Sequence, residues 1–304
     1  MFCSIKRVLI PRVIRQNDMD LNIHGETETG RVRDHNEDMI LILGGEKSPP
    51  GVDALLVVAD GMGGHAAGEV ASNMAVEHIE QQFVSGAFSS TAPDEFEEAL
   101  RSLLQDVNKA VHTAGQDTDK RGMGTTCTLV AIKGKYLYFA HVGDSRAYLL
   151  RGKTLEQITD DHSLVEEMVR DGSLSKEEAR VHPNRNVITR AIGLDSSVVV
   201  DTGGCALRAG DLIMLCSDGL NSMISDEAIH NVLKESSHKI VCANLIAAAN
   251  EAGGHDNTTV AVAYLGGKSK PDDSDPDSST RETLDIKARR PFLKRIWRFI
   301  SRSK

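Results

Sequence analysis

The stretch LLVVADGMGGH (Leu55–His65) is an unbroken apolar run that ends in an aspartate, followed by a glycine-rich turn and a histidine. Such a run favours a buried strand, and the glycines after it favour a tight turn. The design occurs twice more, in YLYFAHVGD (Tyr136–Asp144) and LIMLCSDG (Leu212–Gly219). An aspartate at the end of a buried strand is held by a rigid element and still faces solvent or a metal ion. The sequence therefore predicts carboxylates placed by strand ends.

Five short carboxylate-bearing segments share this character. They are RDHNED (Arg33–Asp38), ADGMGGH (Ala59–His65), VGDSR (Val142–Arg146), CSDGL (Cys216–Leu220) and GGHDN (Gly253–Asn257). Taken alone, an aspartate before glycine is most often a turn or helix-cap residue. Taken together, without a matching set of cysteines or histidines, the five favour one site for a hard cation, Mg²⁺ or Mn²⁺, over a zinc site. Two such ions ~3.5–4 Å apart can bridge a water, lower its pKa and hold it in line with a phosphorus atom.

Two further side chains in these segments suit the hydrolysis of a phosphate ester. Arg33 can grip phosphate oxygens bidentately, and His65 can donate a proton to the leaving alkoxide. The alternatives are a surface ion pair for Arg33 and a histidine without a catalytic role at the start of a helix for His65. Cys216 lacks the phosphate-loop arginine that a cysteine phosphatase needs, so we interpret it as a core residue.

The pattern of strands and helices favours an α+β fold. The predicted strands are rich in Val, Ile, Leu and Tyr and span residues 53–59, 126–132, 136–142, 147–150, 197–206, 211–216 and 258–265. The predicted helices span residues 66–83, 93–114, 164–170, 175–180, 225–234 and 239–252. Residues 133–135 (Lys-Gly-Lys) are a predicted hairpin turn. Because the helices come in pairs between groups of consecutive strands, we expect antiparallel sheets with helices packed outside them.

Composition limits the classes of function. The 304 residues carry a net charge of -9, and residues 287–304 hold eight Lys or Arg and no acid, which leaves -17 on residues 1–286. A strongly acidic body disfavours nucleic acid and suits a site that collects cations. The five cysteines occur singly, without CxxC spacing, which favours a reducing compartment. We therefore predict a cytoplasmic protein, and a monomer by default.

Four regions are predicted along the chain. They are a basic N-terminal extension (1–20), a catalytic domain (21–266), an acidic disordered linker (267–283) and a basic amphipathic C-terminal helix (284–304). Residues 286–304 place apolar side chains on one face and Lys and Arg over much of the rest, which suits peripheral binding to an anionic membrane surface at the inner membrane face. The alternative is a solvated extension, or a helix docked on the acidic body.

The chain resembles a known family, the metal-dependent protein serine/threonine phosphatases of the protein phosphatase 2C type, in their bacterial branch. The resemblance covers roughly residues 22–265. It rests on these motifs in the family's order: RDHNED, DGMGGH, GMGTT (122–126), HVGDSRAYLL (141–150), DHSL (161–164), ITRAIG (188–193), CSDGL and HDNTTV (255–260). A chance match to one motif is easy, whereas the ordered set is highly specific.

The resemblance implies a fold and a set of site residues. The fold is a four-layer α-β-β-α sandwich of two antiparallel sheets flanked by helix pairs, with residues 161–190 as a flap beside the site. The implied metal ligands are Asp38, Asp60, the Gly61 carbonyl, Asp218 and Asp256 at two core ions, Glu37 through water, and Asp144 with Asp218 at a weaker third position. Arg33 would hold the phosphate. His65 would be the proton donor, although Met62 occupies the place where some members carry a histidine.

The resulting prediction is a protein phosphatase that acts on phosphoserine and phosphothreonine through a two-metal bridging hydroxide, opposing a Ser/Thr protein kinase in signalling. Its partners would be phosphorylated protein substrates and that kinase. Three alternatives remain: a catalytically silent phosphoprotein-binding module, a small-molecule phosphomonoesterase, and a membrane-surface scaffold in which the tail is the main functional element.

Overall fold

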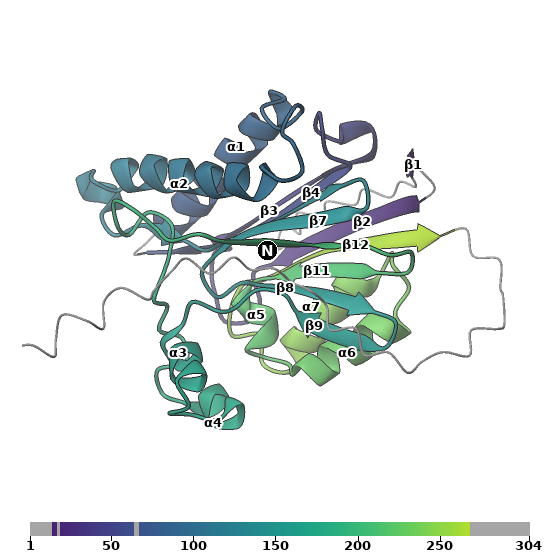
Figure 1. Cartoon of the computed structure of the whole chain (residues 1–304). Helices are drawn as coiled ribbons and strands as arrows, with labels where there is room; N and C mark the ends of the chain where they lie inside the picture. The colour runs from purple at the N-terminus through teal and green to yellow at the C-terminus, as the bar shows by residue number, and fades with distance from the viewer. Residues whose placement is uncertain (1–13, 17–18, 64–66, 268–304) are drawn as a thin grey trace, which may run out of the picture.

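A computed structural model describes residues 14–16, 19–63 and 67–267. Its strands form two antiparallel sheets stacked face to face (Figure 1). The first sheet has the order β1 (Ile14–Gln16), β2 (Met19–Glu28), β12 (Thr258–Gly267), β11 (Leu212–Cys216), β8 (Arg146–Arg151), β9 (Thr154–Gln157). The second has the order β10 (Asp201–Ala206), β7 (Tyr136–Val142), β6 (Cys127–Lys133), β4 (Ala54–Met62), β3 (Asp38–Gly44), and β5 (Gly124–Thr125) pairs with β4.

Helices cover the outer face of each sheet. Helices α1 (Ala67–Val84) and α2 (Phe96–Ala114) lie on the second sheet, whereas α5 (Asp218–Asn221), α6 (Asp226–Glu235) and α7 (Val241–Glu251) lie on the first (Figure 1). The short helices α3 (Leu164–Arg170) and α4 (Lys176–Val181) project away from the sandwich. The predicted α+β class and the α-β-β-α order of layers are confirmed. None of the helices in the described ranges is long and apolar enough to span a bilayer.

Strand β4 shows why the stretch at Leu55 is decisive. Its side chains alternate between two cores: Leu55 and Val57 pack toward α1 and α2, whereas Leu56 and Val58 pack between the two sheets. All four are fully buried. A strand with both faces buried reads as a continuous apolar run, and only a sheet covered on both sides demands such a run. A third core lies between the first sheet and helices α6 and α7.

Several predicted elements differ from the observed ones. Strands β1, β2, β3, β5 and β9 and the short helix α5 were not predicted, and the predicted strand 197–206 begins only at Asp201. Helix α2 begins at Phe96, after a turn at residues 93–95, and not at Pro93. The hairpin turn at residues 133–135 is confirmed, with Gly134 at φ 61°. The predicted boundary at residue 21 falls inside β2, which pairs with β1 in the predicted extension. Apart from Gly267, the predicted linker and C-terminal helix lie outside the described residues.

Candidate metal centre

The predicted carboxylates come from the ends of strands in both sheets. Asp38 begins β3 and faces Asp60 as its register partner on β4. Asp144 follows β7, Asp218 begins α5 directly after β11, and Asp256 lies just before β12. Strand pairing and sheet stacking thus gather side chains that are more than 200 residues apart in sequence. Asp38, Asp60, Asp144 and Asp218 each have at least one other member of the cluster as a source of electrostatic repulsion.

Asp38 shows how these side chains are held. Its Oδ2 accepts hydrogen bonds from the hydroxyls of Ser217 at 2.7 Å and Thr259 at 2.6 Å. Thr259 Oγ1 in turn lies 2.7 Å from Thr27 Oγ1, to which the Asn36 amide donates. The other oxygen of Asp38, Oδ1, is buried and has no hydrogen-bond partner. One side of the carboxylate is therefore fixed by hydroxyls, and the other is left for a different partner.

Four carboxylate oxygens in this region are buried without a hydrogen-bond partner: Glu37 Oε1, Asp38 Oδ1, Asp144 Oδ1 and Asp218 Oδ1. Buried polar atoms normally have partners, so four unpaired oxygens of one chemical type fit the ligands of a cation. Oxygen-only donors fit Mg²⁺ or Mn²⁺.

The pKa values agree with that interpretation. Burial, together with the charges of Asp218 and Asp256, raises the pKa of Asp38 to about 7 even though two hydroxyls oppose the rise. Burial and the charge of Asp256 raise the pKa of Asp218 to about 6. Burial and neighbouring aspartates also raise the pKa values of Asp60 and Asp144 well above the ordinary value. Negative charge in this cluster is unfavourable unless a cation neutralises it.

The cluster is not a closed cage. Within the described residues, no group of three or more Asp, Glu, His or Cys side chains is already arranged to hold an ion. Carboxylates that repel one another do not converge on a point without a positive charge between them. The donor set fits divalent cations. The carboxylates would complete their approach to one another when a cation binds.

Arg33 lies at the edge of the cluster. Its Nη2 donates to Asp256 Oδ2 at 2.7 Å, and about half of its side chain is exposed (49%). An arginine tied to the cluster yet open to solvent can meet an incoming anion. The neighbouring Gly61 donates its N–H to the Glu37 carbonyl at 3.2 Å, and a Cβ there would lie 2.2 Å from the Gly68 carbonyl of α1. Only glycine fits this approach. His65 lies outside the described residues.

The hydroxyl residues around the aspartates were not predicted as part of the site. Besides Ser217 and Thr259, Thr126 Oγ1 accepts from Asp60 N–H at 2.9 Å and lies 2.8 Å from Ser145 Oγ. The signal was present, because CSDGL, VGDSR, GMGTT and HDNTTV each carry a Ser or Thr beside or near the chemistry-bearing residue. The hydroxyls of Ser217 and Thr259 orient the Asp38 carboxylate as outer partners do in metal sites, whereas Thr126 holds the backbone of Asp60.

Similarity to known proteins identifies the family to which this site belongs. Residues 33–244 match the family model of protein phosphatase 2C. The chain belongs to this family. It is 41% identical over 244 residues to the serine/threonine phosphatase stp of Listeria welshimeri, an alignment that covers 79% of this chain and 95% of that protein. It is thus a serine/threonine protein phosphatase of a metal-dependent family.

Solved structures of this phosphatase family have the same fold. Stp1 from Staphylococcus aureus is 34% identical to this chain and superposes with a TM-score of 0.76. The match covers 86% of this chain and 100% of the Stp1 chain. The catalytic domain of PstP, solved in complex with two manganese ions, is 34% identical to this chain, with a TM-score of 0.68. The match covers 81% of this chain and 98% of the PstP chain. Manganese is therefore a metal that this family binds.

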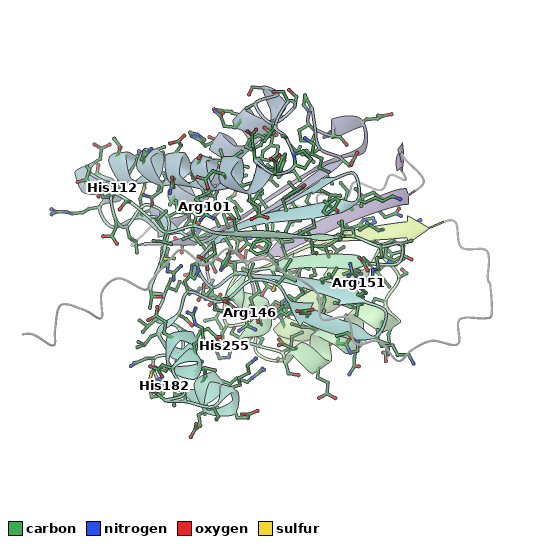
Figure 2. The ribbon with its side chains drawn as sticks, in the orientation of Figure 1. Arg101, His112, Arg146, Arg151, His182 and His255 are labelled. Atoms are coloured by element: carbon green, nitrogen blue, oxygen red, sulfur yellow. The ribbon has the colours of Figure 1, made fainter. Side chains whose placement is uncertain are left out.

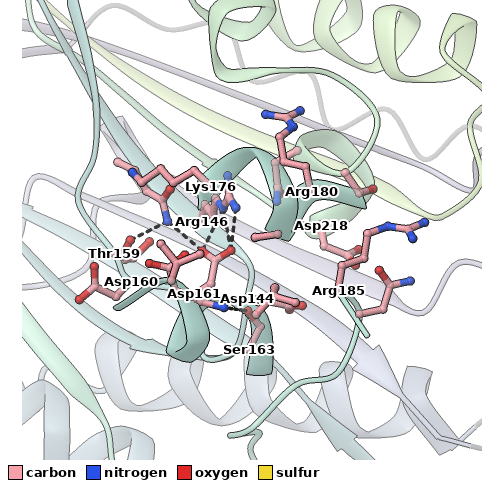
Figure 3. Close-up of a pocket in the computed structure, with 18 of the residues that line it drawn as sticks. Asp144, Arg146, Thr159, Asp160, Asp161, Ser163, Lys176, Arg180, Arg185 and Asp218 are labelled. Atoms are coloured by element: carbon pink, nitrogen blue, oxygen red, sulfur yellow. Dashed lines mark hydrogen bonds and ion pairs between the residues drawn. The ribbon is translucent and has the colours of Figure 1, made fainter. Parts of the chain in front are cut away.

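The phosphatase carries a pocket between this cluster and the projecting helices (Figure 3). Its volume is about 270 Å³, and its lining includes Asp144 and Asp218 of the cluster and Lys176 and Arg180 of α4. Two other residues that line it form a fork: Arg146 donates from Nε and Nη2 to Asp161 at 2.7 to 3.0 Å (Figure 3). This fork fixes the base of residues 161–190, hereafter the flap, against β8.

Proposed function

We propose that this phosphatase hydrolyses phosphoserine and phosphothreonine on proteins with two divalent cations, Mn²⁺ or Mg²⁺, held by the carboxylate cluster, and that it opposes a Ser/Thr protein kinase in signalling. The observation that carries the proposal is the set of four buried carboxylate oxygens without partners. The family relationship supports the chemistry, and the acidic surroundings support the need for cations.

The proposed roles follow the positions described above. The ligands of the two core cations are Asp38, Asp60, the Gly61 carbonyl, Asp218 and Asp256, with Glu37 acting through water; Asp144 joins Asp218 at a weaker third position. When bound, the two cations would lower the pKa of a water so that it can attack phosphorus, and would offset the charge of the phosphate.

The chain's own residues bind and orient the substrate. Arg33, anchored by one nitrogen to Asp256, presents the rest of its guanidinium to the phosphate oxygens. The hydroxyls of Ser217 and Thr259 keep Asp38 in one orientation as charge changes around it. We propose His65 as the group that gives a proton to the leaving serine or threonine oxygen.

Phosphate release from a phosphothreonine peptide tests the proposal, measured with Mn²⁺, with Mg²⁺ and with EDTA. We expect release with either metal and none with EDTA, and a higher kcat/KM for the peptide than for a sugar phosphate. A higher kcat/KM for the sugar phosphate would favour a small-molecule phosphomonoesterase. Absence of release from folded, metal-loaded protein would favour a silent binding module.

For residues 286–304 we propose peripheral attachment to an anionic membrane surface from the cytoplasmic side. Binding of full-length protein and of a variant lacking residues 267–304 to phosphatidylserine vesicles tests this. We expect the truncation to lose vesicle binding and keep its turnover of the peptide. Equal binding by both proteins would reject the attachment.

A further inference from the structure

Both the oxygen and the nitrogen of the Asn257 side-chain amide bond to one loop, residues 29–37, which joins β2 to β3. Its Oδ1 accepts from the Glu37 N–H at 2.9 Å. Its Nδ2 donates to the Thr29 carbonyl at 3.0 Å and to the His35 carbonyl at 2.8 Å. The side chain is buried, with 4% of the residue exposed. Exchanging the amide oxygen and nitrogen would break all three bonds, so the orientation is fixed by the network.

These three bonds tie the two ends of the loop, and in its open middle one further backbone bond, from the Arg31 N–H to the Gly254 carbonyl at 2.7 Å, holds the chain. Thr29 is at the start, and His35 and Glu37 are at the end, whereas residues 31–35 are exposed. Arg33 lies in that open middle. Its contact with Asp256 joins half-exposed groups, and ion pairs of that kind hold a loop weakly. The buried Asn257 side chain therefore supplies hydrogen bonds to the loop on both sides of Arg33.

The backbone of Asn257 is itself confined. Its N–H donates to Asp256 Oδ1 at 2.8 Å. Its carbonyl lies against the turn that follows Asp218, where a Cβ on Gly219 would come within 1.9 Å of the Asn257 oxygen. Asn257 thus contacts three of the five carboxylate segments, those of Arg33–Asp38, Cys216–Leu220 and its own. No step of the proposed chemistry uses its side chain.

We propose that Asn257 is a positioning residue that sets the register of residues 29–37 and so places Arg33 for the phosphate. This inference rests on the proposed role of Arg33. It assigns Asn257 no contact with the substrate or with the cations. Loss of the amide should free the loop while leaving the sandwich folded, because the loop contributes no residue to the three apolar cores.

The test compares Asn257→Ala with Asn250→Ala as a matched control. Asn250, near the end of α7, donates its amide to Glu28 at the end of β2 and so joins neighbouring segments without bonding to residues 29–37. The measurements are hydrogen–deuterium exchange of residues 31–37, the inhibition constant of inorganic phosphate, and KM and kcat for a phosphothreonine peptide with Mn²⁺. Each variant is made in the wild-type and Arg33→Ala backgrounds.

We expect Asn257→Ala to speed exchange at the Glu37 amide and to raise both KM and the phosphate inhibition constant by about tenfold, with a smaller effect on kcat. In the Arg33→Ala background the same change should raise KM less than about threefold, because the residue that it positions is gone. Asn250→Ala should leave exchange of residues 31–37 and both constants unchanged.

Two results would overturn the inference. One is an equal factor on KM in both backgrounds, which would make Asn257 a general structural residue. The other is unchanged exchange of the loop in Asn257→Ala. If Arg33→Ala alone leaves KM unchanged while Asn257→Ala still frees the loop, the failure lies with the proposed role of Arg33, and the loop clamp stands.

Discussion

The carboxylate cluster and the flap adjoin the same pocket, yet they are built in opposite ways. Asp38 and Asp144 are buried side chains at the ends of strands, and hydroxyls from other segments fix Asp38. In the flap, α4 has no buried residue and α3 has one, Val165. The flap is held chiefly at its base, by the fork from Arg146 to Asp161 and by pairing of Ser163 with Ile188.

The difference separates two demands on the molecule. Metal chemistry needs ligands held to a fraction of an ångström, which strand ends supply, and the charge repulsion among them is a cost that the rest of the fold must offset. A flap with few buried contacts adds little stability and opens at low cost. We therefore expect the rigid carboxylate cluster to determine turnover, and the loosely packed flap to determine access of substrate to the pocket.

The largest expected effect comes from removing one charge of the cluster. Asp60→Asn should lower kcat more than about a hundredfold, since loss of outer partners of a metal site alone costs 10- to 100-fold. The same change should raise the melting temperature of the metal-free protein, because it removes a buried negative charge that its neighbours repel. Calorimetry in EDTA and peptide turnover in Mn²⁺ measure the two effects. Lower metal-free stability together with full turnover would remove Asp60 from the site.

Releasing the base of the flap should have the next largest effect. Arg146→Met leaves Asp161 buried without its cation and should cost about 3 kcal/mol of unfolding free energy. It should also expose the flap to trypsin at Arg170 or Arg180. Urea unfolding and limited proteolysis measure the two consequences.

Arg151→Met is the matched control for this experiment. Arg151 makes the same kind of fork, to buried Asp211, farther along the same strand (Figure 2). We expect comparable destabilisation without cleavage in the flap. If both variants are cleaved in the flap at the same rate, the fork at Arg146 does not anchor it in particular.

The sequence predicted the cluster far better than it predicted the supporting structure. Leu55–Ala59 could be recognised because a strand buried on both faces admits no polar residue. Strand β2 (MDLNIHGETE) was missed because it carries polar residues and a glycine, and it is a strand because β12 pairs along its whole length. Register is a tertiary property, and so is the meeting of Asp38 with Asp60. The clamp by Asn257 could not be predicted, since its partners are backbone atoms that any sequence supplies.

A smaller and reversible effect should follow from pH. Folding raises the pKa of Asp38 to about 7 and that of Asp218 to about 6. A raised carboxyl pKa stabilises the fold below the unfolded value near 4, and this stability is lost as pH rises through 6 to 7. Mn²⁺ binds the ionised forms, so the rise in melting temperature on adding Mn²⁺ should be larger at pH 8 than at pH 5.5. An equal rise at both pH values would contradict binding at these carboxylates.

The smallest expected effect tests the flap at its most exposed point. Ser175 and Glu178 form a capping box at the start of α4: Ser175 Oγ accepts from the Glu178 N–H at 3.2 Å, and Glu178 Oε2 accepts from the Ser175 N–H at 2.8 Å. Ser175→Ala removes a cap whose typical contribution is about 1 kcal/mol. Because α4 buries no residue, that loss should stay local and leave the melting temperature of the protein unchanged. Hydrogen exchange should quicken in residues 176–181 and nowhere in the cluster. A fall in melting temperature would show that the flap is coupled to the sandwich beyond its base, and the contrast between the two regions would then be one of degree.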